Sequence, residues 1–135
     1  MNNQSNKNNN KPIIKVWLGE DGIIYIYLAG QLGEEEVKRF IEEKIKILKE
    51  IKGKTKTFGD LRDIKMGNFS LATKIKKMMV SELKELEQEK VEKMALVGKG
   101  VILKVIGSFL GKALGIKETK YFTDKEKALK WLKEG

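Results

Sequence analysis

The side chains best suited to chemistry gather in one segment, residues 60–70. It holds Asp60, Arg62, Asp63, Asn68 and Ser70, and it joins the end of a predicted strand to the start of a predicted helix. Ligands of open α/β sheets collect at the carboxyl ends of strands, and backbone donors at a helix start favour an anion or a phosphate. These five residues are therefore candidates for a partner-binding or phosphorylation site. The simpler alternative is that Asn68 or Ser70 only caps the helix and that Arg62 forms a salt bridge with the two aspartates.

The turn Gly98-Lys99-Gly100 is a second candidate, for an anion or ligand loop, because it also follows a strand and precedes a helix. Its spacing does not fit the phosphate-binding loop of nucleotide hydrolases, which needs four residues between its first glycine and a Gly-Lys pair. The dinucleotide-binding pattern fails as well, because Leu103 stands where the last glycine is required. A tight turn is the plainer interpretation.

Two residue types that dominate enzyme chemistry are missing: the chain has no Cys and no His. Thiolate nucleophiles, disulfides, thiolate metal sites and imidazole bases are therefore excluded. Carboxylate chemistry remains, but the only aspartates are Asp21, Asp60, Asp63 and Asp124. We expect no catalytic residue, metal site or cofactor, and hence a non-enzymatic protein.

The formal net charge is +9, and 26 of the 28 basic residues are Lys, the others being Arg39 and Arg62. Lys offers a mobile point charge where Arg offers bidentate contacts to bases and phosphates, so this excess is a weak sign of nucleic-acid binding. Tyr25 and Tyr27 share one strand face and could form a stacking platform for bases, but a covered sheet face is more ordinary. We expect a protein partner or self-association and no nucleic acid.

The length of 135 residues allows one domain and a short tail. Residues 1–11 contain six Asn and no aliphatic residue after Met1, which predicts a disordered tail before a domain at 12–135. No apolar run follows the start, so export is not indicated and a cytoplasmic location is expected.

The hydrophobic pattern predicts a β-hairpin and then alternating helices and strands. The expected strands are 13–18, 23–29, 55–61, 93–97 and 119–122, with residues 62–68 forming a loop. The expected helices are 34–51, 70–90, 101–114 and 123–133, with Lys44 among the lysines that complement the dipole of the first and Thr123 capping the last. Such an order implies a single α/β domain with about five mostly parallel strands and four helices.

Residues 101–116 are apolar nearly all round. The stretch is too short to span a bilayer, which takes about 20 residues, so burial in the fold, extended by self-association, is the first interpretation. The alternative function is binding of a small apolar or nucleotide ligand, or peripheral contact with a membrane surface. Phe109 and Leu110 are the candidate contact residues.

With this order of elements the chain resembles the STAS/SpoIIAA-like family, the fold of anti-sigma-factor antagonists, with a distant likeness to CRAL-TRIO (SEC14-type) lipid-binding domains. The resemblance covers about residues 13–134. It is carried by residues 56–64, by the strand at 91–98 followed by an apolar helix, and by the ending Phe122-x-Asp124-x-x-x-Ala128-x-x-Trp131-Leu132. It implies a regulatory module that acts through protein–protein interaction. Ser70 matches the position of the regulatory serine in phosphorylatable members, within Asn68-Phe69-Ser70-Leu71 instead of Asp-Ser-Ser-Gly.

Overall fold

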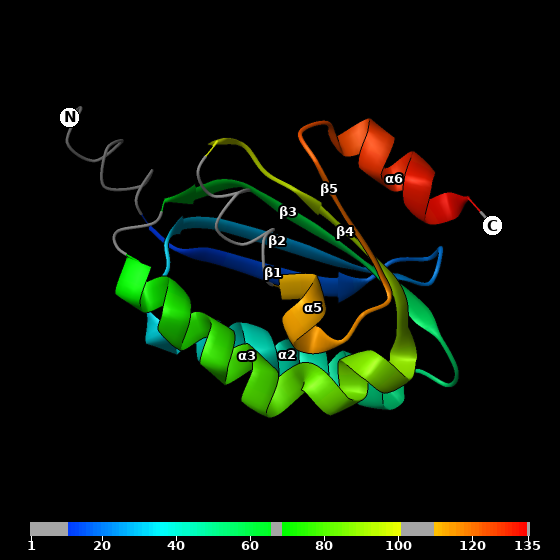
Figure 1. Ribbon diagram of the computed structural model, residues 1–135, viewed down its shortest axis with the longest axis horizontal. Coiled ribbons are helices and arrows are strands. Elements are labelled where there is room, and N and C mark those ends of the chain that lie inside the picture. The colour runs from blue at the N-terminus through cyan, green and yellow to red at the C-terminus, as the bar shows by residue number, and fades with distance from the viewer. Residues whose placement is uncertain (1–10, 66–68, 101–109, 135) are drawn as a thin grey trace.

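The computed structural model describes residues 11–65, 69–100 and 110–134, except for the side chains of 69–72 and 110. The predicted tail up to residue 10, Asn68 and Phe109 lie outside these residues. The described chain forms one α/β domain with a five-stranded, mostly parallel sheet and four helices, as predicted (Figure 1). The strand order is β1-β2-β3-β4-β5, the order in which the strands occur in the chain.

The fold begins with the predicted hairpin of β1 (Ile13–Leu18) and β2 (Ile23–Gln31), which pair antiparallel. The amide of Gly22 donates to the carbonyl of Gly19 at 3.0 Å, and the amide of Gly19 donates to the carbonyl of Ile23 at 2.8 Å. Gly22 has φ +80°, a left-handed conformation that glycine adopts without a steric penalty. This is a tight turn closed by a glycine bulge, which suits the twist of a hairpin.

The remaining elements alternate as expected, with shifted ends. They are α2 (Glu34–Glu50), β3 (Thr55–Lys65), α3 (Phe69–Lys90), β4 (Val91–Val97), α5 (Leu110–Leu114), β5 (Glu118–Phe122) and α6 (Lys125–Lys133). Strands β2 to β5 are all parallel to one another. Of the apolar stretch 101–116, only its end is described.

The predicted loop at 62–68 is wrong in its first half, because β3 continues through Lys65. Strand β2 is also longer than predicted, and Ala29, Gly30 and Gln31 pair with residues 63–65 beyond a bulge. Arg62 and Asp63 are polar, as loop residues often are, but they continue β3, and their side chains bind Asp60 and Tyr27. Ile64 then returns to the core.

Helices cover the sheet on both faces (Figure 1). Helices α2, α3 and α5 lie on one face, where the larger hydrophobic core includes Ile24, Phe40, Leu83 and Leu96. Helix α6 lies on the other and packs on β3, β4 and β5 over a smaller core of Ile23, Phe58, Ala95, Val97, Ala128 and Leu132. The β1–β2 half of that second face remains without a helix among the described residues.

Helix α6 is capped at both ends by side chains. Asp124, and not the predicted Thr123, is the N-cap, and its carboxylate accepts from the amides of Glu126 and Lys127 at 2.8 and 3.4 Å. A carboxylate both accepts these bonds and suits the positive helix end, which favours Asp over its Thr neighbour. At the other end Lys56 donates to the carbonyl of Leu132 at 2.5 Å, and Lys93 donates to that of Glu134 at 3.1 Å.

Candidate partner-binding site

Asp60 and Arg62 form a bidentate pair at the carboxyl end of β3. Arg62 donates from Nε to Oδ1 at 3.0 Å and from Nη2 to Oδ2 at 2.8 Å, and its amide donates to Oδ1 at 3.2 Å. The predicted salt bridge is thus confirmed for Asp60. Burial by itself raises the pKa of the Asp60 carboxyl, but the bonds from Arg62 and its positive charge outweigh burial and hold that pKa below its ordinary value. Asp60 is therefore an ionised, paired carboxylate at neutral pH.

Asp63 has a different partner, the hydroxyl of Tyr27, which donates to its Oδ2 at 2.6 Å. The bulge between β2 and β3 brings the two side chains together from positions that a regular ladder would separate. The hydrogen bond to Asp63, followed by partial burial, raises the pKa of the Tyr27 hydroxyl from 10.0 to about 12. The sequence does not predict this contact, because the residue types in the two strands do not indicate a bulge.

One pocket at this edge of the sheet is lined by residues from both candidate segments, 60–70 and 98–100. It is lined by Tyr27, Arg62 and Asp63, by Lys99 from the turn after β4, and by the chain entering β1 at Lys11. We call these five residues the carboxyl-edge cluster. It presents acceptors and cations side by side, an arrangement that suits recognition of a polar partner.

The turn at residues 98–100 contributes only Lys99 to this cluster. The amide of Gly98 donates to the carbonyl of Phe122 at 3.0 Å, so it continues the sheet. Gly100 has φ +59°. These features support the tight-turn interpretation, while an anion loop around Lys99 stays a prediction.

Ser70 is the second residue of α3, and in the sequence it follows Asp63 of the carboxyl-edge cluster. One turn further on, Lys74 is bound to Glu34 of α2 by an exposed ion pair of 3.1 Å. The first turns of α2 and α3 are therefore adjacent, since both helices start from the same edge of the sheet. The role of Ser70 stays a prediction.

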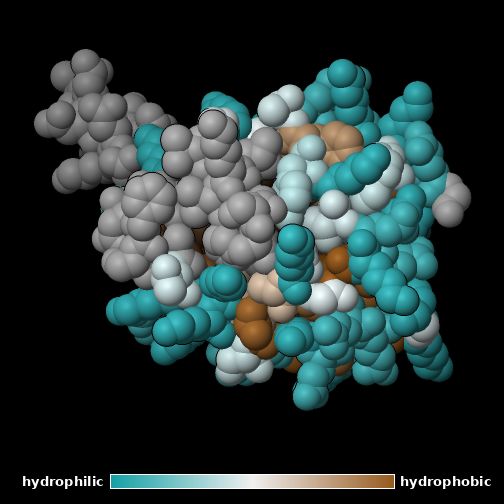
Figure 2. Space-filling view, in the orientation of Figure 1, coloured by the Kyte–Doolittle hydropathy of each residue, from teal (hydrophilic) through white to brown (hydrophobic). Residues whose placement is uncertain are grey.

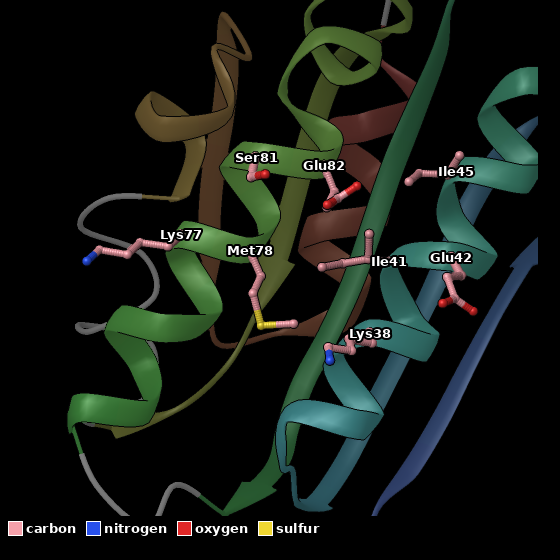
Figure 3. A pocket seen from close by; sticks show the side chains of 8 residues that line it. All are labelled: Lys38, Ile41, Glu42, Ile45, Lys77, Met78, Ser81 and Glu82. Carbon is pink, nitrogen blue, oxygen red and sulfur yellow. The ribbon is translucent and has the colours of Figure 1, made fainter.

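Between α2 and α3 runs a groove that the sequence did not indicate. Its lining residues are Lys38, Ile41, Glu42, Ile45, Lys77, Met78, Ser81 and Glu82. Figure 3 shows Met78 and Ile41 pointing toward one another across the groove, while Lys77 points away from it. We call this feature the α2–α3 groove. Its apolar residues were assigned to the core stripes of two separate helices, and only the packing of the helices shows that Ile45 and Met78 stay half exposed.

The described end of the apolar stretch 101–116 belongs to the core. Leu114 and Ile116 are buried, and a Cβ at Gly111 would overlap the side chain of Thr119. This supports burial for residues 111–116. Figure 2 shows small hydrophobic areas among hydrophilic side chains over α3 and α5. The contact role of Leu110 stays a prediction.

Tyr25 and Tyr27 both lie half-buried on the uncovered part of the sheet, as their spacing predicts. The Tyr25 ring stacks on Trp17, with centroids 5.4 Å apart and planes at 12°, and its hydroxyl donates to Asp21 at 2.6 Å. A carboxylate thus stands beside each tyrosine hydroxyl. Because carboxylates repel a phosphate backbone, we still expect no nucleic acid here.

Within the described residues, no group of three or more acidic side chains is placed to hold a metal ion. None of the described helices is long and apolar enough to cross a membrane.

A family model for SpoIIAA-like proteins matches residues 23–133. The chain belongs to the SpoIIAA-like family. Two solved structures resemble this SpoIIAA-like chain over nearly its whole length. A protein from Shewanella loihica PV-4 with a SpoIIAA-like fold has a TM-score of 0.64 at 19% identity, over 90% of this chain and 93% of its own. An anti-sigma factor antagonist from Mycobacterium paratuberculosis has a TM-score of 0.59 at 13% identity, over 93% of this chain and 97% of its own.

At such identities these two structures show a shared fold. No curated protein matches the SpoIIAA-like chain.

Proposed function

We infer that the chain is a non-enzymatic regulatory module that binds a protein partner through residues 60–70 and the exposed side of α3. Membership of the SpoIIAA-like family supports this proposal. So does the pairing at the carboxyl edge. Asp60 is held ionised by Arg62, so it is not set up as a proton donor for catalysis, and Asp63 is occupied by the hydrogen bond that it accepts from Tyr27.

The α2–α3 groove is the observation that carries the proposal. Its apolar residues Ile41, Ile45 and Met78 lie between charged side chains of both signs on the two helices. Grooves of this kind receive the apolar face of an amphipathic helix, and the surrounding charges fix its orientation. We propose that the partner offers such a helix, with both acidic and basic residues beside its apolar stripe.

The carboxyl-edge cluster would contact the same partner beyond the end of the groove. Residues Glu34 and Lys74 connect the two surfaces, because their ion pair joins α2 to α3 near the sheet edge. A partner lying along α3 therefore meets apolar contacts in the groove and polar contacts at the edge.

The test is a pull-down from the native host with the whole chain as bait, followed by affinity measurements with the purified partner. Met78→Lys places a charge in the groove and should raise the Kd at least about thirtyfold, the effect expected for a central interface residue. Thr123→Lys is the matched control, because it adds the same charge at an exposed residue that lies outside the groove. A partner that binds the native chain and Met78→Lys equally well would show that the groove is not the binding site.

Enzymatic activity would contradict the other half of the proposal. A metal-dependent hydrolysis that Asp60→Ala and Asp63→Ala abolish, in variants that keep the native circular-dichroism spectrum, would show that the carboxyl edge is catalytic.

A further inference from the structure

Large apolar side chains are exposed on one strand. Among the described residues, the exposed large hydrophobic residues are Ile13, Trp17 and Leu18, which keep 40%, 46% and 48% of their full accessible surface. All three belong to β1, which lies at one edge of the sheet (Figure 1). A soluble protein usually keeps such residues off an open edge strand, because the edge is a template for pairing.

Among the described residues, the outer backbone edge of β1 is also available for pairing. Of the described strands, only β2 pairs with it. The hydrogen bond from Gly19 to Ile23 closes the hairpin, so that Trp17–Tyr25 and Lys15–Tyr27 are the hydrogen-bonded pairs of the ladder. In an antiparallel ladder the residues between such pairs direct their N–H and C=O groups outward. In β1 these are Ile14, Val16 and Leu18.

We propose that a second copy of this chain pairs with β1, antiparallel, about a two-fold axis at Val16, which joins the two sheets into one of ten strands. The outward-facing residues would then form the bonded pairs: Val16 with Val16 of the second copy, and Ile14 with its Leu18. The exposed Leu18 is thereby covered by an apolar neighbour.

The side chains of β1 complement one another in this register. Lys15 lies opposite Trp17 of the second copy in a non-bonded pair, where side chains approach most closely. An ammonium over an indole ring is a favourable contact, and Trp17 is already fixed in place by stacking on Tyr25. The one charged residue of β1 thus gains a partner.

Neighbouring two-fold registers lack this match. An axis at Lys15 would set two lysines against each other, and an axis at Trp17 would place Ile14 opposite the hairpin turn.

Helix α2 supplies a second complementary pair. Arg39 and Glu43 lie one turn apart on α2 and line a groove along β1 with residues 14–17. With a two-fold axis beside this groove, Arg39 of each copy would face Glu43 of the other copy. Self-complementary charge is what an isologous interface requires, and it favours a second copy over an unrelated extended peptide.

Sedimentation velocity of the full chain tests the association. Specific interfaces bury about 1,200 to 2,000 Å², and pairing of one six-residue edge lies at the lower end, so we expect a dimer with a Kd of about 1 to 100 μM. Val16→Pro removes the outward amide and also shortens a half-buried side chain, so Val16→Ala, which keeps the amide, is its control; the proline variant alone should give a monomer, and both should keep the native circular-dichroism spectrum. A chain that stays monomeric up to about 200 μM, or a dimer that Val16→Pro leaves intact, overturns the proposal.

Cysteine cross-linking tests the register. Because the chain has no Cys, any disulfide of a single-cysteine variant joins two copies. Val16→Cys sets two thiols across a pair whose Cα atoms are about 5.5 Å apart, within the range a disulfide needs. Ile14→Cys is the matched control, since the two Cα atoms at that position would lie about 14 Å apart. Equal cross-linking at positions 14 and 16 contradicts the two-fold axis at Val16.

A charge exchange tests the contribution of α2. Arg39→Glu or Glu43→Arg alone sets like charges against each other and should raise the dimer Kd about tenfold, whereas the double variant should restore it. If the double variant does not recover the native dimer Kd, α2 does not contribute to the interface. The α2–α3 groove is untouched by these variants, so this result is independent of the partner-binding proposal.

Discussion

The side chain of Lys44 on α2 meets that of Glu87 on α3 inside the protein, with 1% and 0% of the two side chains exposed. The ammonium approaches Oε1 of the carboxylate closely enough for an ion pair. Apart from this ion pair, neither oxygen of Glu87 has a hydrogen-bond partner within the described structure. Two helices that cover the same face of the sheet are thus joined by one buried pair of opposite charges.

This pair predicts a strong asymmetry between single and double substitutions. Glu87→Ala leaves the buried Lys44 without its counter-charge and should lower the free energy of unfolding by about 3 to 5 kcal/mol. The double variant Lys44→Met/Glu87→Leu removes both charges and should be as stable as the native chain or more so. Urea denaturation measures both, and equal losses in the single and double variants would contradict a role for the charge pair.

The tyrosines of β2 should titrate late and for different reasons. The pKa of Tyr27 is raised to about 12 first by its hydrogen bond to Asp63, and that of Tyr25 is raised to about 12 first by burial and then by Asp21. Asp63→Ala should therefore return the pKa of Tyr27 toward 10.0, while Asp21→Ala lowers the pKa of Tyr25 but leaves it above 10.0 because burial remains. NMR signals of the tyrosine rings, followed through alkaline pH, report each group.

The same shifts set the sign of the alkaline stability change. Both hydroxyls have a higher pKa in the folded chain than in the unfolded one, so their contribution is complete below pH 10 and is lost as the pH rises through about 12. Thermal unfolding should show a falling melting temperature across this window. Tyr27→Phe should make the fall shallower, and an identical profile for that variant would contradict the linkage.

The N-cap of α6 gives a matched pair of adjacent residues. Asp124→Ala removes the acceptor of two amides and should lower the free energy of unfolding by about 0.5 to 2 kcal/mol. Thr123→Ala should change it by less than about 0.5 kcal/mol, because the cap lies one residue later. Chemical denaturation of the two variants decides between the positions.

Ser70 should affect partner binding more than stability. A phosphate in the first turn of α3 would be favoured by the helix start, yet it would stand near the carboxylates of Asp60 and Asp63 in the chain. Ser70→Asp should therefore change the partner's affinity while Ser70→Ala preserves it. If the partner binds the native chain and both variants equally well, Ser70 has a capping role only.

Local patterns predicted the elements, because turn glycines and apolar spacing act within a few residues. The bounds of β1 and the start of α2 were correct for this reason. The end of β3 was not, since the pairing of residues 63–65 depends on a bulge and on the extra length of β2.

The same local patterns do not predict contacts between helices. Lys44 was expected to serve the dipole of its helix, as an exposed lysine does, but it is buried against Glu87. A Lys or Glu among many others looks solvent-exposed until a second helix is packed against it. The sequence does not predict the α2–α3 groove for the same reason, whereas it does predict the pairing of Asp60 with Arg62, because the two residues are two positions apart in one segment of the chain.

The strands follow one another across the sheet in the order of the chain, and this has a consequence for synthesis on the ribosome. Each new strand can dock beside the one before it as it emerges. The face formed by Phe58, Ala95 and Val97 stays uncovered until α6, which follows all five described strands in the chain, has been synthesised. This second core therefore closes only when Ala128 and Leu132 are present, whereas the strands can pair before then.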